Sequence, residues 1–335
     1  MKLKDKVLCI LEENRGAHIS GAEIAKRLEV SRNAVWKAVE DLRSGGTGIE
    51  AVRNGGYCIP ADESSLSVQG IEAILGQSDY IINVEQSVTS TNTVLKELAQ
   101  QGCPEGYVLI ARQQTAGKGR LGRSFYSPPD SGLYLSVVLR PHMNVEDALF
   151  ITTSAAVAVS RAIETCCDHQ RTAQIKWVND IYLDEKKVCG ILTEAAIDFE
   201  SGGLEYAVLG IGVNITPPED DFPDGLSDTA TSIFSSRKIG NLRNRLAAEI
   251  LRELSALPDG FMSEKTLDEY RKRSLLIGKN AYALFKNEAK PCRVLGIDDR
   301  ARLLVSFGDG SEQALSSGEV SVKRSVPEHN GGGDL

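Results

Sequence analysis

The sequence has 335 residues, of which 41% are hydrophobic and 25% charged, as expected for a folded protein of two or three domains without an unusual composition. Its net charge of -8 argues against a uniformly basic nucleic-acid binder, and no apolar run approaches the ~20 residues that a membrane span needs. The charged N-terminus lacks the pattern of a signal peptide, and seven scattered cysteines without a CxxC pair indicate reduced thiols, so we expect a cytoplasmic protein.

Residues 1–60 carry the pattern of a winged helix-turn-helix DNA-binding domain. Three short amphipathic helices are predicted, the second capped by Ser20 with Glu23 as capping-box partner and the third running from Ser31 to about residue 43. A hairpin with a turn at Asn54 follows as the wing. The segment has ten Lys and Arg against eight acids, a balance of +2, whereas the remainder has 28 against 38, a balance of -10. The residue types that contact DNA lie at the start of the third helix: Ser31, Arg32, Asn33, Trp36 and Lys37.

A second interpretation of residues 1–60 is a small helical dimerisation or regulatory domain. The order of three helices and a Gly-Gly hairpin favours DNA binding. A polar linker separates this segment from the next one.

Residues 67–273 alternate short strands with a few helices, which predicts an α+β domain with a mixed sheet and not a doubly wound one. The predicted strands are 81–86, 107–111, 133–139, 174–177, 181–183, 187–194 and 206–214. Helices are predicted after residues 89–92 and over 148–167, 243–257 and 263–273.

The last segment, residues 276–325, consists of short strands joined by Gly, Asp and Asn turns. This pattern predicts a small β-barrel. We expect the Gly-rich residues 326–335 to form a disordered tail.

The most informative run is residues 114–123, which read QTAGKGRLGR. Glycines allow the backbone to approach a ligand, and the cations between them provide a site for phosphate or carboxylate. The run matches neither a P-loop nor a helix-opening GxGxxG, and prolines follow it. It predicts a flexible basic loop between strands that closes over an anionic ligand, the alternative being a solvated turn.

Three further elements could serve the same ligand. Ser90, Thr91 and Asn92 stand at a predicted helix N-terminus, where a plain cap is the alternative. Lys176 lies in an apolar strand before Asn179 and Asp180, where the alternative is a lysine that snorkels to the surface. Glycines at 210 and 212 interrupt a strand, and either close approach of a ligand or a sheet bulge would account for them.

Together these motifs resemble the biotin–protein ligase family. The matching runs are TSTN at 89–92, the loop at 114–123, KWVND at 176–180, KVCGILTE at 187–194 and GIGVN at 210–214, in the family's order. With the N-terminal winged helix and the C-terminal barrel, the whole chain is similar to the family's bifunctional bacterial form, which is also the biotin operon repressor. Two positions depart from the family's pattern: Lys118 replaces an arginine and loses bidentate geometry, and Val178 replaces a proline.

The resemblance implies a class II synthetase-like catalytic domain and an SH3-like C-terminal barrel. It also implies a biotin–[acetyl-CoA-carboxylase] ligase that forms biotinyl-5′-AMP from biotin and ATP, then transfers biotin to a lysine of biotin carboxyl carrier protein. ATP and Mg²⁺ would be co-substrate and ion, biotin the substrate, and no prosthetic group is tightly bound. An adenylate-bound homodimer would bind operator DNA, and no membrane is involved.

The resemblance also assigns roles to individual residues. Catalysis falls to Lys176, Arg120 and Lys118, and Mg²⁺ binding to Asp180. Biotin binding is assigned to Ser90, Thr91, Asn92, Gln114, Gly117, Gly119, Arg120, Lys176, Gly210 and Gly212. Binding of ATP or the adenylate is assigned to Lys118, Arg120, Arg123, Asn179 and Asn214.

Two other functions stay open at this stage. A lipoate-type ligase has a related body, and competition between biotin and lipoate distinguishes it. A catalytically inactive, ligand-sensing regulator would show no ATP–pyrophosphate exchange. The four dispersed histidines give no transition-metal site.

Overall fold

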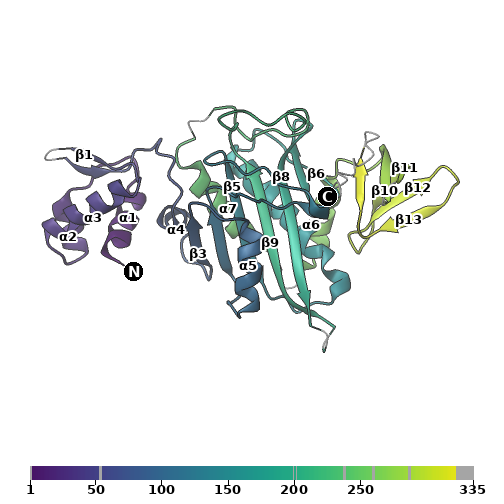
Figure 1. Cartoon of the computed structure of the whole chain (residues 1–335), viewed down its shortest axis with the longest axis horizontal. Coiled ribbons are helices and arrows are strands. Elements are labelled where there is room, and N and C mark those ends of the chain that lie inside the picture. Colours follow the sequence, from purple (N-terminus) through teal and green to yellow (C-terminus); the bar gives the residue numbers. More distant parts are fainter. Residues whose placement is uncertain are drawn as a thin grey trace, which may run out of the picture.

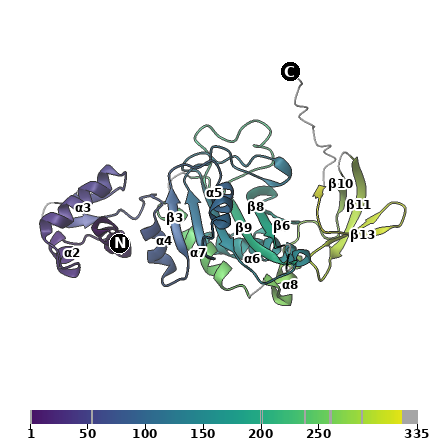
Figure 2. The ribbon, with the colours of Figure 1, turned by 60° about the horizontal axis from the view of Figure 1, so that its bottom comes forward.

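The computed structural model describes residues 2–52, 55–198, 200, 202–236, 239–258, 261–285 and 288–321. Three units follow one another along the molecule. A small helical unit and a small β-sheet unit lie at opposite ends of a larger central unit (Figures 1 and 2).

The N-terminal unit contains three helices and a two-stranded hairpin. Helices α1 (Leu3–Glu13), α2 (Gly21–Arg27) and α3 (Arg32–Ser44) precede the antiparallel strands β1 (Glu50–Val52) and β2 (Gly56–Cys58). The Ser20 and Ser31 hydroxyls accept the backbone N–H groups of residues 23 and 34, as expected for N-caps. The Glu23 carboxylate, predicted as a capping-box partner, instead pairs with Arg27 at 2.5 Å. The predicted turn residue Asn54 lies outside the described residues.

The linker between this unit and the central one is hydrogen-bonded on both sides. From the turn after α1, Arg15 Nη1 donates to the carbonyls of Pro60 (3.2 Å) and Glu63 (2.8 Å). From the central unit, Asn244 accepts the N–H of Ser67 (3.0 Å) and donates to the carbonyl of Ser65 (2.9 Å). Because Asn244 is completely buried, these bonds are shielded from water. Hydrogen bonds therefore fix the linker, residues 60–67, to both neighbouring units.

The central unit is built on a seven-stranded mixed sheet with the order β3-β4-β5-β9-β8-β7-β6. Strands β3 and β4 are parallel and all other neighbours antiparallel, which confirms the predicted α+β class. The strands are β3 (Ile81–Glu85), β4 (Tyr107–Ala111), β5 (Gly132–Leu139), β6 (Gln174–Lys176), β7 (Asp180–Leu183), β8 (Lys186–Ile197) and β9 (Leu204–Asn214).

Side-chain alternation gives the two sheet faces different roles. In β9, Leu209, Ile211 and Val213 point into the main core with α6 (Leu149–Cys166) and α7 (Leu242–Ser255). On the other face, Tyr206 and Val208 pack under α5 (Thr91–Gln100) in a smaller core. Further along β9 that face carries only glycine until Asn214, so β9 itself adds no large side chain there beyond the N-terminus of α5.

Helix α6 is the apolar centre of the molecule. The helical stretch Val145–Cys166 has the length and composition of a membrane span, and 78% of its apolar window is buried inside the protein, as in a core helix. Helix α8 (Glu264–Lys272) packs beside it, and Glu164 of α6 pairs with Arg273 at 2.6 Å.

The C-terminal unit is a five-stranded antiparallel sheet with the order β13-β12-β11-β10-β14. Its strands are β10 (Asn280–Phe285), β11 (Glu288–Ile297), β12 (Leu303–Phe307), β13 (Glu312–Leu315) and β14 (Glu319–Ser321), as the predicted run of short strands requires. The Trp177 indole donates to the carbonyl of Ala301 at 3.1 Å, so this unit contacts the central one through the KWVND segment. The predicted tail lies outside the described residues.

Among the α-helices of the described residues, one was not predicted. Helix α4 (Val68–Leu75) begins after Ser67, whose hydroxyl accepts the N–H of Gly70, and it packs between α1 and α7. Its Gly70 lies against Asn244, where an added Cβ would approach the amide nitrogen to 2.4 Å. A short helix with an internal glycine gives a weak periodic signal.

Candidate active site

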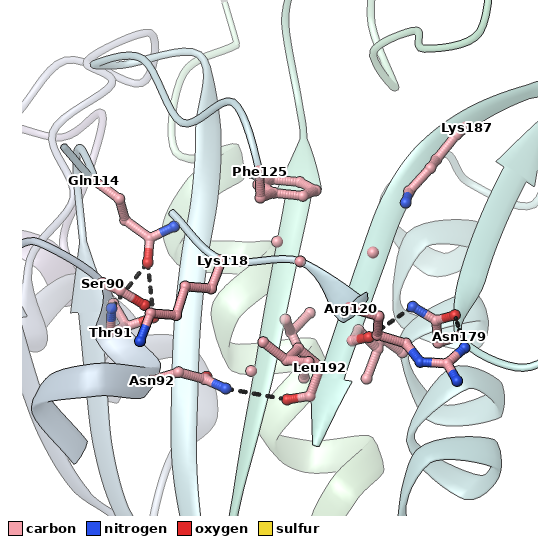
Figure 3. A pocket seen from close by; sticks show the side chains of 16 residues that line it. Ser90, Thr91, Asn92, Gln114, Lys118, Arg120, Phe125, Asn179, Lys187 and Leu192 are labelled. Carbon is pink, nitrogen blue, oxygen red and sulfur yellow. Dashed lines mark hydrogen bonds between the residues drawn. The ribbon is translucent and has the colours of Figure 1, made fainter. Parts of the chain in front are cut away.

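The floor of the candidate site is a patch of the central sheet in which three of four paired positions are glycine. Gly190 of β8 pairs with Gly212 of β9, and Leu192 pairs with Gly210. The Phe125 ring lies over the two paired glycines, and a Cβ added at Gly212 would come within 2.6 Å of it. The two glycines therefore leave space for the Phe125 ring, which Figure 3 labels, to lie against the sheet.

One wall of this cavity is the N-terminus of α5. Its first N–H, that of Thr91, is accepted by Gln114 Oε1 at 2.8 Å, whereas Ser90, the N-cap residue, makes no side-chain capping bond. The Ser136 hydroxyl lies 2.7 Å from both Thr91 Oγ1 and Asn92 Oδ1. A buried polar network with a helix N-terminus can hold a neutral or anionic head group.

Asn92 is the centre of that network. Its amide nitrogen donates to the carbonyl of Leu192 (3.2 Å) and to Glu194 (3.0 Å), and Glu194 also accepts from Lys96 at 2.7 Å. Burial raises the pKa of Glu194, but the bonds from Lys96 and Asn92 outweigh it and hold that pKa below its usual range. The carboxylate is therefore ionised and fixes the orientation of Asn92.

The opposite wall is the basic loop between β4 and β5. Lys118, Gly119, Arg120 and Phe125 from this loop line the first cavity, whose volume is about 50 Å³. Arg120 Nη1 donates to Asn179 Oδ1 at 3.0 Å, and Asn179 Nδ2 donates to the carbonyl of Ile191 at 2.8 Å, which ties the loop to β8 (Figure 3). A short 3₁₀ turn at Arg120–Gly122 is the only helical element of the loop's described residues.

A second cavity of about 110 Å³ adjoins the first. Both are lined by Gly119, Arg120, Phe125, Asn179 and Lys187, and the second also by Lys176, Trp177, Asp180 and Arg123. Gly318 of the C-terminal unit completes its lining. The peptide bond between Trp177 and Val178 is cis, and Tyr270 donates to the Val178 carbonyl at 3.0 Å.

Cations dominate the two linings. Among the described lining residues, Lys118, Arg120 and Lys187 face the first cavity, and Arg123 and Lys176 are added in the second. Asp180 is the one acid in these linings, and it pairs with Lys187 at 2.7 Å. The site thus carries excess positive charge beside an apolar floor, which suits an anion with an uncharged body.

The structure brings most of the predicted ligand residues together. Ser90, Thr91, Asn92, Gln114, Lys118, Gly119, Arg120, Asn179, Gly210 and Gly212 line the first cavity, and Arg123, Lys176 and Asp180 line the second. Gly117 lies beside them, where an added Cβ would be 3.0 Å from Gln114 Nε2. Asn214 lies outside both linings, and its amide donates to the carbonyl of Thr231 at 3.2 Å.

The magnesium assignment has limited support from these residues. The described part of the chain holds no group of three or more His, Cys, Asp or Glu side chains able to bind a metal. Asp180 is already paired with Lys187. The residues therefore do not form a metal site by themselves, and any Mg²⁺ would depend on ligand oxygens.

Ten lining residues carried no predicted role: Leu121, Ser124, Phe125, Trp177, Lys187, Gly190, Ile191, Leu192, Ile211 and Gly318. Phe125 follows the glycine–cation run by two residues, and an aromatic residue there is a usable signal. Gly190 and Lys187 lie within a family motif, but their positions depend on how β8 pairs with β7 and β9.

The predicted DNA-facing residues share one exposed helix face. Arg32, Asn33, Trp36 and Lys37 of α3 are all exposed, and Trp36 keeps 52% of its surface in water. Ser31 differs from the others, because its hydroxyl caps α3. An exposed tryptophan beside cations, on a helix of this unit, suits contact with a duplex.

The fold and the site define a class of protein in which a helix-turn-helix unit is joined to a mixed-sheet ligase unit. Residues 4–58 match the family described as "HTH domain", and residues 84–214 match the Biotin/lipoate A/B protein ligase family. The chain belongs to the biotin/lipoate A/B protein ligase family, and specifically to its biotin ligases with an N-terminal helix-turn-helix.

Relatives similar over nearly the whole chain support this assignment. The "Bifunctional ligase/repressor BirA" of Bacillus spizizenii is 34% identical over 94% of this chain and 97% of its own length. The protein of that name from Escherichia coli is 27% identical over 92% of this chain and 94% of its own. The solved structure of a mutant biotin protein ligase from Aquifex aeolicus in complex with biotin is 26% identical and covers 73% of this chain and 98% of its own, with a TM-score of 0.56.

Proposed function

We propose that the protein is a bifunctional biotin–protein ligase and biotin-responsive transcriptional repressor. The observation that carries this proposal is a cationic, glycine-floored cavity in a chain similar over 94% of its length to a bifunctional ligase/repressor. Residues 1–60 would bind DNA, 67–273 would perform the ligase reaction, and 276–325 would form a third, accessory domain. A catalytically inactive, ligand-sensing regulator would use the same cations to bind an anion, so the ATP–pyrophosphate exchange assay separates the two functions.

The first step would join biotin to AMP. The biotin carboxylate attacks the α-phosphorus of ATP, the bond from that phosphorus to the bridging oxygen breaks, and pyrophosphate leaves. Ser90, Thr91, Asn92 and Gln114 would hold the polar ring of biotin, with Gly210 and Gly212 beneath it. Lys176, Arg120 and Lys118 would neutralise charge that develops at the reacting oxygens.

The second step would use the mixed anhydride. A lysine amine of the carrier protein attacks the biotinyl carbonyl, an amide forms, and AMP leaves. Loop residues 117–123 would shield the anhydride from water until the carrier arrives. Arg123 and Asn179 would contact the adenylate. Asn214 would serve ATP only indirectly, because it lies outside both cavity linings. Mg²⁺ would enter with the ATP phosphates near Asp180, and no step is derived through it.

The enzymatic half is tested by biotin-dependent ATP–pyrophosphate exchange with the purified chain. We expect exchange with biotin and none with lipoate at equal concentration. Exchange that lipoate supports equally would favour a lipoate-type ligase. A folded protein with no exchange under either condition would favour the non-catalytic regulator.

The regulatory half would depend on adenylate-promoted dimerisation. Two α3 helices of a two-fold dimer would enter successive major grooves of a pseudo-palindromic operator. Such a protein would act in the cytoplasm, where the operator, the carrier and ATP are found. The seven cysteines are all free, in keeping with that compartment.

A substitution on α3 tests the DNA-binding face. Lys37→Ala removes an exposed cation, so we expect about ten-fold weaker operator binding and a salt-dependence slope smaller by about one, as for one lost phosphate contact. Fluorescence anisotropy with operator DNA, biotin and ATP at several salt concentrations measures both. Lys265→Ala in α8 removes an equivalent exposed charge and should change neither. Equal effects of the two substitutions would show that overall charge, and not this face, governs binding.

A further inference from the structure

The basic loop that covers the candidate site is closed at its base by a cluster of three charged residues. Arg112 directly follows β4, and Asp130 stands two residues before β5, so they flank the loop. Arg112 Nε and Nη2 donate to Asp130 Oδ1 at 3.0 Å and 2.7 Å. Both side chains are partly in water, with 26% and 47% of their surface exposed, so this pair alone would hold the loop weakly.

A third, buried residue strengthens the contact between Arg112 and Asp130. Arg243, in the first turn of α7, has only 5% of its side chain exposed. Its Nη1 donates to Asp130 Oδ1 at 2.8 Å and its Nη2 to the Asp130 backbone carbonyl at 2.7 Å. One guanidinium therefore holds both the side chain and the backbone of the same residue, which fixes its orientation.

The backbone conformation and the charge of Asp130 both depend on these arginines. Its φ of 56° lies in the left-handed region, which is unfavourable for a residue with a Cβ. Burial acts to raise its pKa, but the hydrogen bonds from Arg112 and Arg243 outweigh burial and bring the pKa below its usual range. The carboxylate is thus ionised and bound by two arginines.

A short segment, restricted by prolines and hydrogen bonds, connects Asp130 to the ligand cavity. Two prolines precede Asp130, and the carbonyl of Pro128 accepts from Tyr134 at 2.9 Å. Ser127, next to them, accepts from Gln114 Nε2 at 2.9 Å, and its carbonyl accepts the Gln114 N–H at 3.1 Å. Gln114 then contacts Thr91 at the first cavity.

Stability alone does not explain a buried arginine here. Among the described residues, Arg243 Nε has no hydrogen-bond partner although it is buried. An apolar side chain of similar size would avoid burying that donor and the charge. Departures of this kind are typical of sites kept for function.

We infer that Arg243 is a positioning residue of the ligase, which through Asp130 and Arg112 holds the basic loop closed over the activated intermediate. The inference rests on the proposed function for its catalytic consequence, but the closure of the loop can be measured without catalysis. Arg243 reaches no ligand, since it lines neither cavity.

The experiment compares three variants of the full chain. Arg243→Met keeps much of the volume and removes the donors, and Asp130→Asn keeps the shape of the acceptor and removes its charge. Arg245→Met is the matched control, because Arg245 lies on the same helix but bonds Thr165 and Asp168, away from the loop. Thermal melting of each variant by circular dichroism identifies any that fails to fold.

The first measurement needs no ligand. Lys118, Arg120 and Arg123 are tryptic sites within the loop, so the rate of cleavage there reports how often the loop opens. We expect about ten-fold faster cleavage in Arg243→Met and Asp130→Asn, no further increase when the two are combined, and the wild-type rate in Arg245→Met. Wild-type cleavage rates in the folded Arg243 and Asp130 variants would overturn the inference.

The second measurement concerns the intermediate. With labelled ATP, biotin and no carrier, we expect Arg243→Met to form adenylate within about three-fold of the wild-type rate but to lose it about ten-fold faster. Equal slowing of adenylate formation and release would point to a merely structural role and overturn the inference. Failure of the wild-type chain to form adenylate would refute the proposed function, while the cleavage rates would still decide whether Arg243 closes the loop.

Discussion

Lys176→Ala is expected to lower biotin-dependent ATP–pyrophosphate exchange by about 10³-fold, the scale found when a preorganised charge at a reacting oxygen is removed. Lys176 ends strand β6, lies opposite Asp180 in the sheet register and lines the second cavity, next to the loop cations. Lys176 lines only the second of the two cavities, so we propose that the carboxylate and the α-phosphate react there, within reach of its ammonium. Because that contact strengthens as charge moves between them, its loss should reduce the rate more than biotin affinity.

The controls separate charge from position. Lys176→Arg keeps the charge and should restore part of the lost exchange. Lys279→Ala removes an exposed lysine outside both cavities and should leave the exchange rate unchanged. Isothermal titration with biotin should give nearly unchanged affinity for Lys176→Ala. Exchange within ten-fold of the wild type would remove Lys176 from the chemistry.

The second large effect is expected at the floor of the cavity. Gly210→Ala adds a Cβ that would lie 2.0 Å from Asn92 Oδ1, so the Asn92 side chain must move. Its bonds to Leu192 and Glu194 and its contact with Ser136 would then break. A displaced Asn92 would no longer hold the polar ring of biotin. We expect about 100-fold weaker biotin binding, equivalent to losing two to three hydrogen bonds to biotin at about 1 kcal/mol each.

Calorimetric titration with biotin measures this loss. Gly296→Ala is a suitable control, because a Cβ there meets no atom within 4 Å and the residue lies in β11 of the C-terminal unit. Unchanged biotin affinity in a folded Gly210→Ala protein would show that Asn92 takes no part in binding.

Much of the fold could be predicted from local patterns. The long strands β5 and β9 and the helices α3 and α6 carry clear periodicity or capping residues, and their observed bounds differ from prediction by a residue or two. Helix α2 begins directly after its predicted cap, Ser20. The predicted α+β class and membership of the biotin–protein ligase family are confirmed. The short helix α4 was missed because eight residues with an internal glycine resemble a continuation of the linker.

The candidate site was less predictable, because its geometry depends on contacts between distant residues. That Gly190 faces Gly212 follows only from the register of β8 and β9. The pairing of Asp180 with Lys187 likewise needs the turn from β7 into β8, and it weakens Asp180 as an independent metal ligand. Gly318 reaches the second cavity from a separate unit, and nothing in its local sequence points there. The functional roles of the lining residues remain predictions.

The hydrogen-bonded linker between the N-terminal and central units restricts the geometry of the operator. Arg15 and Asn244 hold residues 60–67 from both sides, so each α3 helix would keep a fixed distance and angle to its own ligase unit. In a two-fold dimer the distance between the two α3 helices would then also be fixed. Half-sites moved apart by half a turn of the double helix would present one groove on the wrong side of the duplex, and flexible tethers could not compensate.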